Sequence, residues 1–165
     1  MDQTHPTPSV NETEFEKPRG IRKVEVRTGF AQANISGLSE PLVQARIQVL
    51  EAVAEAGVSL DFLKLTPAGM SFLVTEEDTD ILSAALDKLG VRYAVQKDQR
   101  IVLVHAVNMR DEEGLLAGIV VRAIGSGARI DHASDMHDRM LLVMSAEEAE
   151  RVRSVLETAT AGVKA

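Results

Sequence analysis

The chain of 165 residues contains no cysteine and no tryptophan, and only one tyrosine and four phenylalanines. Without cysteine it cannot form disulfides, thiolate zinc sites or a cysteine nucleophile. So few aromatic rings leave little material for the stacking platforms of proteins that bind single-stranded nucleic acid. Acidic residues number 25 and basic residues 18, which gives a formal net charge of -7. Because binding to a phosphate backbone needs a surplus of cations, we expect no nucleic acid partner.

Long apolar runs are also missing. No stretch approaches the ~20 residues that a membrane-spanning helix needs, and none resembles the apolar region of a secretory signal. We therefore expect a cytoplasmic protein with no membrane partner. Residues 1–20 contain three prolines and few large hydrophobic side chains, a composition that predicts a disordered N-terminal tail.

The sequence repeats itself at an offset of 70 residues, without a gap, over more than fifty positions. The pairs match apolar residues and also glycine, aspartate and hydroxyl residues. They include Leu50 and Val120, Gly57 and Gly127, Asp61 and Asp131, Met70 and Met140, Phe72 and Leu142, Thr75 and Ser145, and Leu86 and Leu156. We interpret the chain as two copies of one unit, with boundaries at 21–98 and 99–165.

Each copy shows the same order of strand and helix periodicities. The expected strands are 31–35, 60–66, 70–75 and 91–95 in the first copy, and 101–106, 129–134 and 139–144 in the second. The expected helices are 43–54, one from Thr79, 115–124 and one from Ser145. Ser145 and Glu148 have the spacing of a capping box. Gly57 and Gly127 follow the first helix of their copies, where a left-handed residue is common.

The predicted fold class is therefore α+β: two ferredoxin-like units of βαββαβ order, each with an antiparallel sheet and helices on one face. The second copy lacks a final strand. A further strand is expected at 21–28, where Val24 and Val26 alternate with charged neighbours. Our hypothesis is that this leading strand completes one of the two sheets by exchange between copies or chains.

The turn before the first helix of the second copy runs from Val107 to Gly114, in the order Val-Asn-Met-Arg-Asp-Glu-Glu-Gly, and the helix and strands after it continue to Met144 without a gap. These residues and the tandem order resemble ACT domains, in particular the regulatory region of aspartate kinases. The resemblance implies a regulatory module that is not an enzyme, an effector amino acid of the lysine or threonine class, self-association and a catalytic kinase subunit as partner. It implies no cofactor.

The resemblance also implies where an effector binds. The candidate ligand residues are Asn108, Met109, Arg110, Asp111, Glu113, Gly114, Leu115, Ser134 and Asp135. A helix N-terminus opened by glycine suits a carboxylate, and Asp111 or Glu113 suits an ammonium group. The alternative is that these acidic residues only favour the start of a helix.

The first copy departs from this pattern. Its turn contains Ser39 and Glu40 followed by Pro41, and Gln44 takes the position that corresponds to Gly114. Ser39, Glu40 and Gln44 are secondary ligand candidates, although a capped helix start also accounts for them. If the pocket is lost in both copies, the chain is a ligand-free module for oligomerisation or protein interaction.

One cluster of histidine and carboxylate residues has the side chains that could bind a metal ion. It contains Asp131, His132, Asp135, His137 and Asp138, with His105 on a strand that we expect to lie beside it. His132 and His137 are separated by an odd number of positions, so on an unbroken strand their side chains would point to opposite faces of the sheet. We therefore expect a polar turn and no metal site. We also expect no catalytic residues, because the sequence contains no phosphate-binding GxxxxGK loop and no nucleophile beside an oriented base.

Overall fold

The structure is a computed structural model that describes residues 20–106, 109, 112–136 and 138–161. Its elements are β1 (Ile21–Ser36), α1 (Leu42–Glu55), β2 (Phe62–Thr66), β3 (Gly69–Thr75), the short 3-10 helix η1 (Glu76–Asp78), α2 (Thr79–Leu89), β4 (Arg92–Ala106), α3 (Leu115–Gly125), β5 (His132–Asp135), β6 (Arg139–Ser145) and α4 (Ala146–Ala161). The predicted tail at 1–20 lies outside the described residues except for Gly20.

The strands form one antiparallel system with the order β2-β3-β1-β4-β6-β5. It divides into two halves of four strands, because β1 and β4 run through both. Residues 30–36 of β1 pair with β3 and with the first part of β4. Residues 21–27 of β1 pair with 101–106 of β4, and β6 pairs with the same part of β4 on its other side. The predicted α+β fold of two ferredoxin-like units is confirmed.

The leading strand is therefore exchanged between the copies, as hypothesised. Val24, in the first half of β1, lies opposite Val104 in the second half of β4. The sequence-based division into separate strands at 21–28 and 31–35 was wrong, and so was the division at 91–95 and 101–106. Each pair forms a single strand of 16 or 15 residues.

The two long strands change sheet at an irregular segment. The pairing of β1 with β4 shifts register between Arg27 and Phe30 and again before Gln32. On β4 the neighbouring Asp98 has a left-handed φ of 61°. Its N–H donates to the Glu76 carboxylate at 2.8 Å, and its own carboxylate pairs with Arg100 at 2.6 Å. Such side-chain bonds hold a conformation that few residues other than glycine adopt.

Each half has its own helices and its own core. In the first unit, Val49 and Val53 of α1 and Leu82 and Leu86 of α2 are buried against alternate residues of β1 and β3. The corresponding positions of α3 and α4 are buried against β4 and β6; they are Ile119, Ala123, Val152 and Leu156. The offset of 70 thus relates equivalent core positions, which confirms the repeat.

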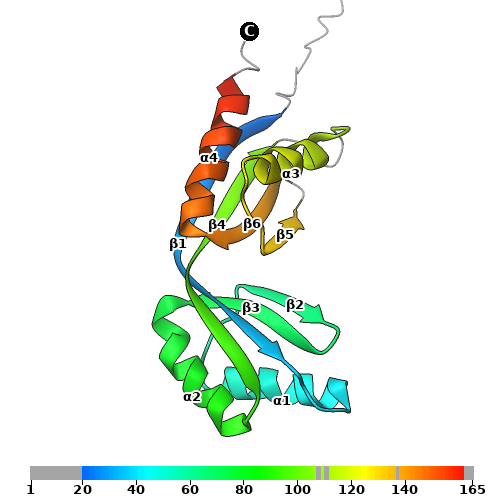
Figure 1. Ribbon diagram of the computed structural model, residues 1–165, viewed down its shortest axis with the longest axis vertical. Helices are drawn as coiled ribbons and strands as arrows, with labels where there is room; N and C mark the ends of the chain where they lie inside the picture. Colours follow the sequence, from blue (N-terminus) through cyan, green and yellow to red (C-terminus); the bar gives the residue numbers. More distant parts are fainter. Residues whose placement is uncertain (1–19, 107–108, 110–111, 137, 162–165) are drawn as a thin grey trace, which may run out of the picture.

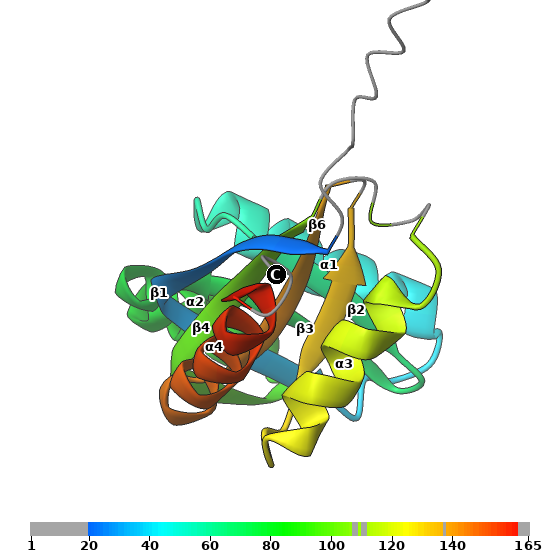
Figure 2. The ribbon, with the colours of Figure 1, turned by 90° about the horizontal axis from the view of Figure 1, so that it is seen from above.

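The sheet faces that carry no helices turn toward each other. Leu73 of β3 packs with Ile101 and Leu103 of β4 and with Val143 of β6 in a third buried cluster. Figure 1 shows α1 and α2 on the outer side of the lower sheet and α3 and α4 on the outer side of the upper one. Viewed from above, α3 and α4 lie over the strands and α1 and α2 beyond them (Figure 2). The molecule is thus layered helix, sheet, sheet, helix.

Two local predictions are also confirmed. The Ser145 hydroxyl and N–H donate to the Glu148 carboxylate at 2.7 and 3.3 Å, and the Glu148 N–H donates to the Ser145 hydroxyl at 3.4 Å. This is the reciprocal capping box. Gly57 and Gly127 both have left-handed backbones, with φ of 74° and 81°.

Candidate functional site

The predicted ligand turn ends at Gly114, which has a left-handed φ of 78° and opens α3. A Cβ at this position would meet no atom within 4 Å, so backbone conformation, and not space, is the reason for glycine. The N–H of Leu115 donates to the Glu112 carbonyl at 3.2 Å, and the N–H of Gly118 donates to Gly114 at 2.8 Å. Among the described residues, the N–H groups of Leu116 and Ala117 between them have no partner, so this helix start has donors for an anion.

The other predicted residues of this turn differ in what they offer a ligand. Asn108, Arg110 and Asp111 lie outside the described residues. Met109 and Leu115 are buried in the core of the second unit, so their side chains serve packing. Glu113 is exposed. The neighbouring Glu112, which was not predicted, accepts a bond from the Gly20 N–H at 2.8 Å and so ties the start of β1 to the turn.

The first-copy candidates form a helix start of a different kind. Ser39, Glu40 and Gln44 are all exposed. The Glu40 carboxylate accepts a bond from the Leu42 N–H at 2.9 Å, so a carboxylate of the chain itself already occupies this end of α1. Helix α1 begins at Leu42, before Gln44, whereas Gly114 precedes α3. Gln44 is therefore inside the first turn of its helix, and the equivalence with Gly114 at an offset of 70 ends here.

Ser134 and Asp135 lie on β5, the outer strand of the second unit. The structure places Ser134 at a groove of about 530 Å³ between the units. Strand β2 of the first unit forms one wall, and the later part of α3 with the segment leading into β5 forms the other. The lining residues are Phe62, Leu63, Lys64, Val120, Ile124, Ile130, Asp131, His132, Ala133 and Ser134. Gly114, at the opposite end of α3, is not among them.

A buried polar cluster lies beside this groove and joins the two units. Its members are Gln32 of β1, Ser71 of β3 and His132 of β5, each at least nine-tenths buried. The Gln32 amide nitrogen lies 2.9 Å from His132 Nε2 and 3.0 Å from the Ser71 hydroxyl, which is itself 3.2 Å from His132 Nε2. The His132 ring also contacts the Phe62 ring, with centroids 5.4 Å apart.

The surroundings of His132 favour its neutral form. Burial and, next, the Lys64 ammonium lower the pKa of His132, while the Asp131 carboxylate acts in the opposite direction.

The sequence reasoning identified His132, Ser134 and Asp131 but missed the residues that the first unit contributes, Gln32, Phe62, Lys64 and Ser71. A signal for two of them was present. Gln32 and Ser71 are polar residues within strands whose neighbours are buried and apolar. Polar residues on such strands point either to solvent or to a partner surface.

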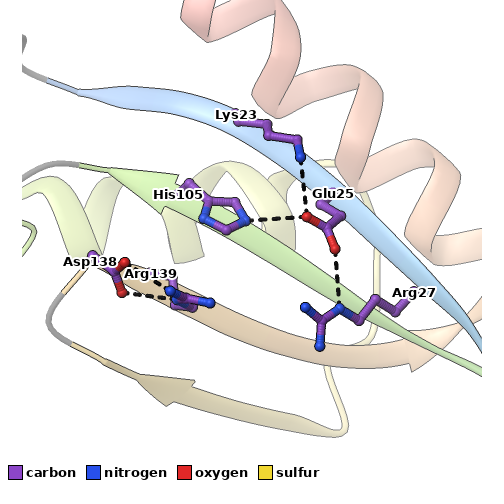
Figure 3. A network of polar contacts seen from close by, with 6 residues as sticks. All are labelled: Lys23, Glu25, Arg27, His105, Asp138 and Arg139. Carbon is purple, nitrogen blue, oxygen red and sulfur yellow. Dashed lines mark hydrogen bonds and ion pairs between the residues drawn. The ribbon is translucent and has the colours of Figure 1, made fainter.

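The proposed neighbour of the polar cluster, His105, indeed lies on the adjacent strand, opposite Arg139 of β6. It belongs, however, to a charged network on the open face of the second sheet (Figure 3). Its Nε2 is 3.6 Å from the Glu25 carboxylate, which bonds to Lys23 at 3.2 Å and Arg27 at 3.1 Å. The bonds from Arg27 and Lys23 lower the pKa of Glu25.

Asp138 also joins this face, because its carboxylate pairs with Arg139 at 2.9 Å, and this bond lowers the pKa of Asp138. In the part of the chain that the structure describes, no three histidine and carboxylate side chains come together as metal ligands. His137 lies outside that part. Helices with the length and apolarity of a membrane span are likewise absent from the described residues.

No protein-family model matches the chain, and no curated protein matches its sequence. Solved structures do match its fold. The ligand-free regulatory subunit of aspartate kinase from Thermus thermophilus is similar with a TM-score of 0.76 and 21% identity, over 86% of this chain and 98% of that one. A structure of aspartokinase alpha and beta subunits is similar with a TM-score of 0.73 and 23% identity, over 86% of this chain and 99% of that one.

Escherichia coli aspartokinase III, in complex with lysine and aspartate, gives a TM-score of 0.65 and 14% identity, over 91% of this chain and 34% of that one. At these identities the likeness establishes architecture. The chain therefore has the fold of the regulatory subunit of aspartate kinase, two ferredoxin-like units in tandem.

Proposed function

We propose that this chain is a regulatory module that binds an amino-acid effector and controls a catalytic chain of the aspartate kinase type, without catalysing a reaction itself. The observation that carries the proposal is the near-complete coverage of an aspartate kinase regulatory subunit, 98% of its length, by a chain that also keeps a glycine-opened α3. The effector class we propose is lysine or threonine, in the cytoplasm.

The proposed effector site is the start of α3. The N–H groups of Leu116 and Ala117, which have no partner within the described residues, and the positive end of the helix dipole suit the effector carboxylate. The exposed carboxylate of Glu113 suits its ammonium group. Asn108, Arg110, Asp111 and Asp135 remain proposed contributors, whereas Ser134 lines the groove at the other end of α3 and is not part of this site. Met109 and Leu115 act from the core by fixing the turn.

A mechanism follows from the way the units are joined. β1 and β4 belong to both sheets, so a ligand that prefers one arrangement of the units also shifts the other unit. Regulation requires only this difference in affinity between two arrangements. Strands β2 and β5 are the outer strands of the sheet order, and we propose that they take part in self-association or in docking to the catalytic chain.

The test is thermal unfolding in the presence of each of the twenty amino acids. A ligand at 100 times its dissociation constant adds about 2.7 kcal/mol to the free energy of unfolding, which raises the midpoint of a domain of this size by roughly 5 to 10 °C. We expect lysine or threonine to give this shift. Gly114→Ala should abolish it. Gly90→Ala is the matched control, because Gly90 is also left-handed, with φ of 66°, and also has open space around its Cβ.

A second candidate function is a ligand-free assembly module. The occupation of the α1 start by Glu40 favours it, because one of the two helix starts is already closed by the chain's own carboxylate. No shift with any amino acid, together with concentration-dependent self-association, would favour assembly over sensing.

A further inference from the structure

The groove between β2 and the α3–β5 segment is built from both units. Phe62, Leu63 and Lys64 come from the first, and the remaining lining residues come from the second. Its volume of about 530 Å³ lies in the range of small-molecule sites. It is separate from the effector site proposed above, which lies at the other end of α3.

The groove offers donors for an anion from both units. Lys64 is exposed and has no ion-pair partner among the described residues. His132 also lines the groove. The Ser134 hydroxyl also lines the groove. An ammonium and a hydroxyl together suit a carboxylate.

Another part of the groove lining is apolar. Val120 and Ile124 come from α3 and Ile130 from the segment before β5. Ile124 is 57% exposed, which is unusual for a large aliphatic side chain that has a core beside it. A short branched aliphatic chain, four or five carbons long, would cover these side chains and remove apolar surface from water.

The groove also contains a negatively charged side chain. The Asp131 side chain lines the groove and is only 11% exposed, and it is paired with Arg129 at 3.2 Å. Arg129 is itself 81% exposed, so this pair is open to exchange with a ligand cation. The groove thus has a place for an ammonium group in addition to the places for a carboxylate and an apolar chain.

We propose that this groove is a second ligand site, for a small aliphatic carboxylic acid, and that its occupant bridges the two units. Lys64 and Ser134 hold the carboxylate, and Val120, Ile124 and Ile130 hold the chain. Such a ligand contacts β2 and α3 at once, so it binds only when the two sheets face each other as they do here, and it favours that arrangement by mass action.

The experiment is isothermal titration calorimetry on the full chain at pH 7.5 with three probes that share one branched skeleton: leucine, 4-methyl-2-oxopentanoate and 4-methylpentanoate. We expect saturable binding of at least one. If leucine binds most tightly, Asp131 contacts the ammonium group of the ligand. If either of the other two binds most tightly, the carboxylate and the aliphatic part of the ligand suffice for binding. No binding of any of the three would overturn the proposal.

Two pairs of variants locate the site. Lys64→Ala should weaken binding about tenfold or more, the loss expected for one charge-assisted contact, and Lys88→Ala, which removes an exposed lysine on α2, should not. Ile124→Glu should abolish binding, whereas Val121→Glu should leave it unchanged. Val121 is 68% exposed on the same helix and does not line the groove, so the second pair has matched exposure and charge.

The same titrations separate this site from the proposed effector site. We expect Gly114→Ala to bind the probes like the unmodified chain. If Gly114→Ala loses them and Ile124→Glu keeps them, the groove proposal is overturned and the effector site at α3 stands. Unchanged affinity in Lys64→Ala would also overturn the groove proposal.

Discussion

His132 Nε2 on β5 lies 2.9 Å from the amide nitrogen of Gln32 on β1, although the two residues are a hundred positions apart in the chain. The contact crosses between the open faces of the two sheets, beside the apolar cluster of Leu73, Ile101, Leu103 and Val143. His132, whose surroundings favour its neutral form, is therefore part of what holds the units together.

This contact predicts a dependence of stability on pH. Because the pKa of His132 is lowered in the folded chain, the unfolded chain binds more protons at acid pH, and the free energy of unfolding decreases as the pH falls below about 6.5, the ordinary histidine value. Above that pH the contribution of this group is constant. The pH dependence can be measured by urea unfolding of the unmodified chain and of His132→Gln between pH 7.5 and 5.5, which gives the free energy of unfolding of each at every pH. The difference between the two should shrink on acidification, and parallel pH profiles would show that His132 does not titrate in this way.

The exchanged strand predicts that β1 stabilises the second unit. Val24 is nearly buried in the core with Val104, so Val24→Ala should lower the free energy of unfolding by about 2 kcal/mol. Arg22→Ala, on the exposed side of the same strand, should change it by less than about 0.5 kcal/mol. Denaturant titrations of the two variants measure these free energies of unfolding. Equal values for Val24→Ala and Arg22→Ala would mean that the first half of β1 is not part of the core.

Two glycines predict effects of opposite sign. A Cβ at Gly69 would collide with the backbone carbonyl oxygen of Ile35, so Gly69→Ala should destabilise the chain by at least about 2 kcal/mol. Gly118 lies inside α3, and a Cβ there would approach only the end of the Arg122 side chain at 3.8 Å. Gly118→Ala should therefore stabilise the chain by up to about 1 kcal/mol. Melting temperatures that move in the same direction for both variants would contradict this packing.

The repeat made the unit predictable from the sequence, because both copies keep the same buried positions. The long strands were harder to predict. The segment from Gln96 to Arg100 is polar and charged, which is typical of a loop, yet β4 passes through it from one sheet to the other. Pairing with β1 and side-chain bonds around Asp98 supply the order that local sequence does not.

The candidate sites, like the long strands, were predictable only where a local sequence pattern was present. Gly114 was predictable as the residue that opens a helix, because a helix start has a local signature, and α3 begins at Leu115 directly after it. The groove and the cluster of Gln32, Ser71 and His132 were not, because they depend on how two sheets meet face to face. Contacts between residues that are 39 to 100 positions apart have no periodicity that a single sequence reveals.

The proposed regulatory role is tested most directly with an aspartate kinase catalytic chain from the same organism, assayed for phosphoryl transfer with and without this chain. The account predicts that lysine or threonine inhibits the kinase only when this chain is present, and that Gly114→Ala removes this inhibition whereas Gly90→Ala retains it. Kinase activity that responds to both amino acids identically in the presence and absence of the chain would contradict the account.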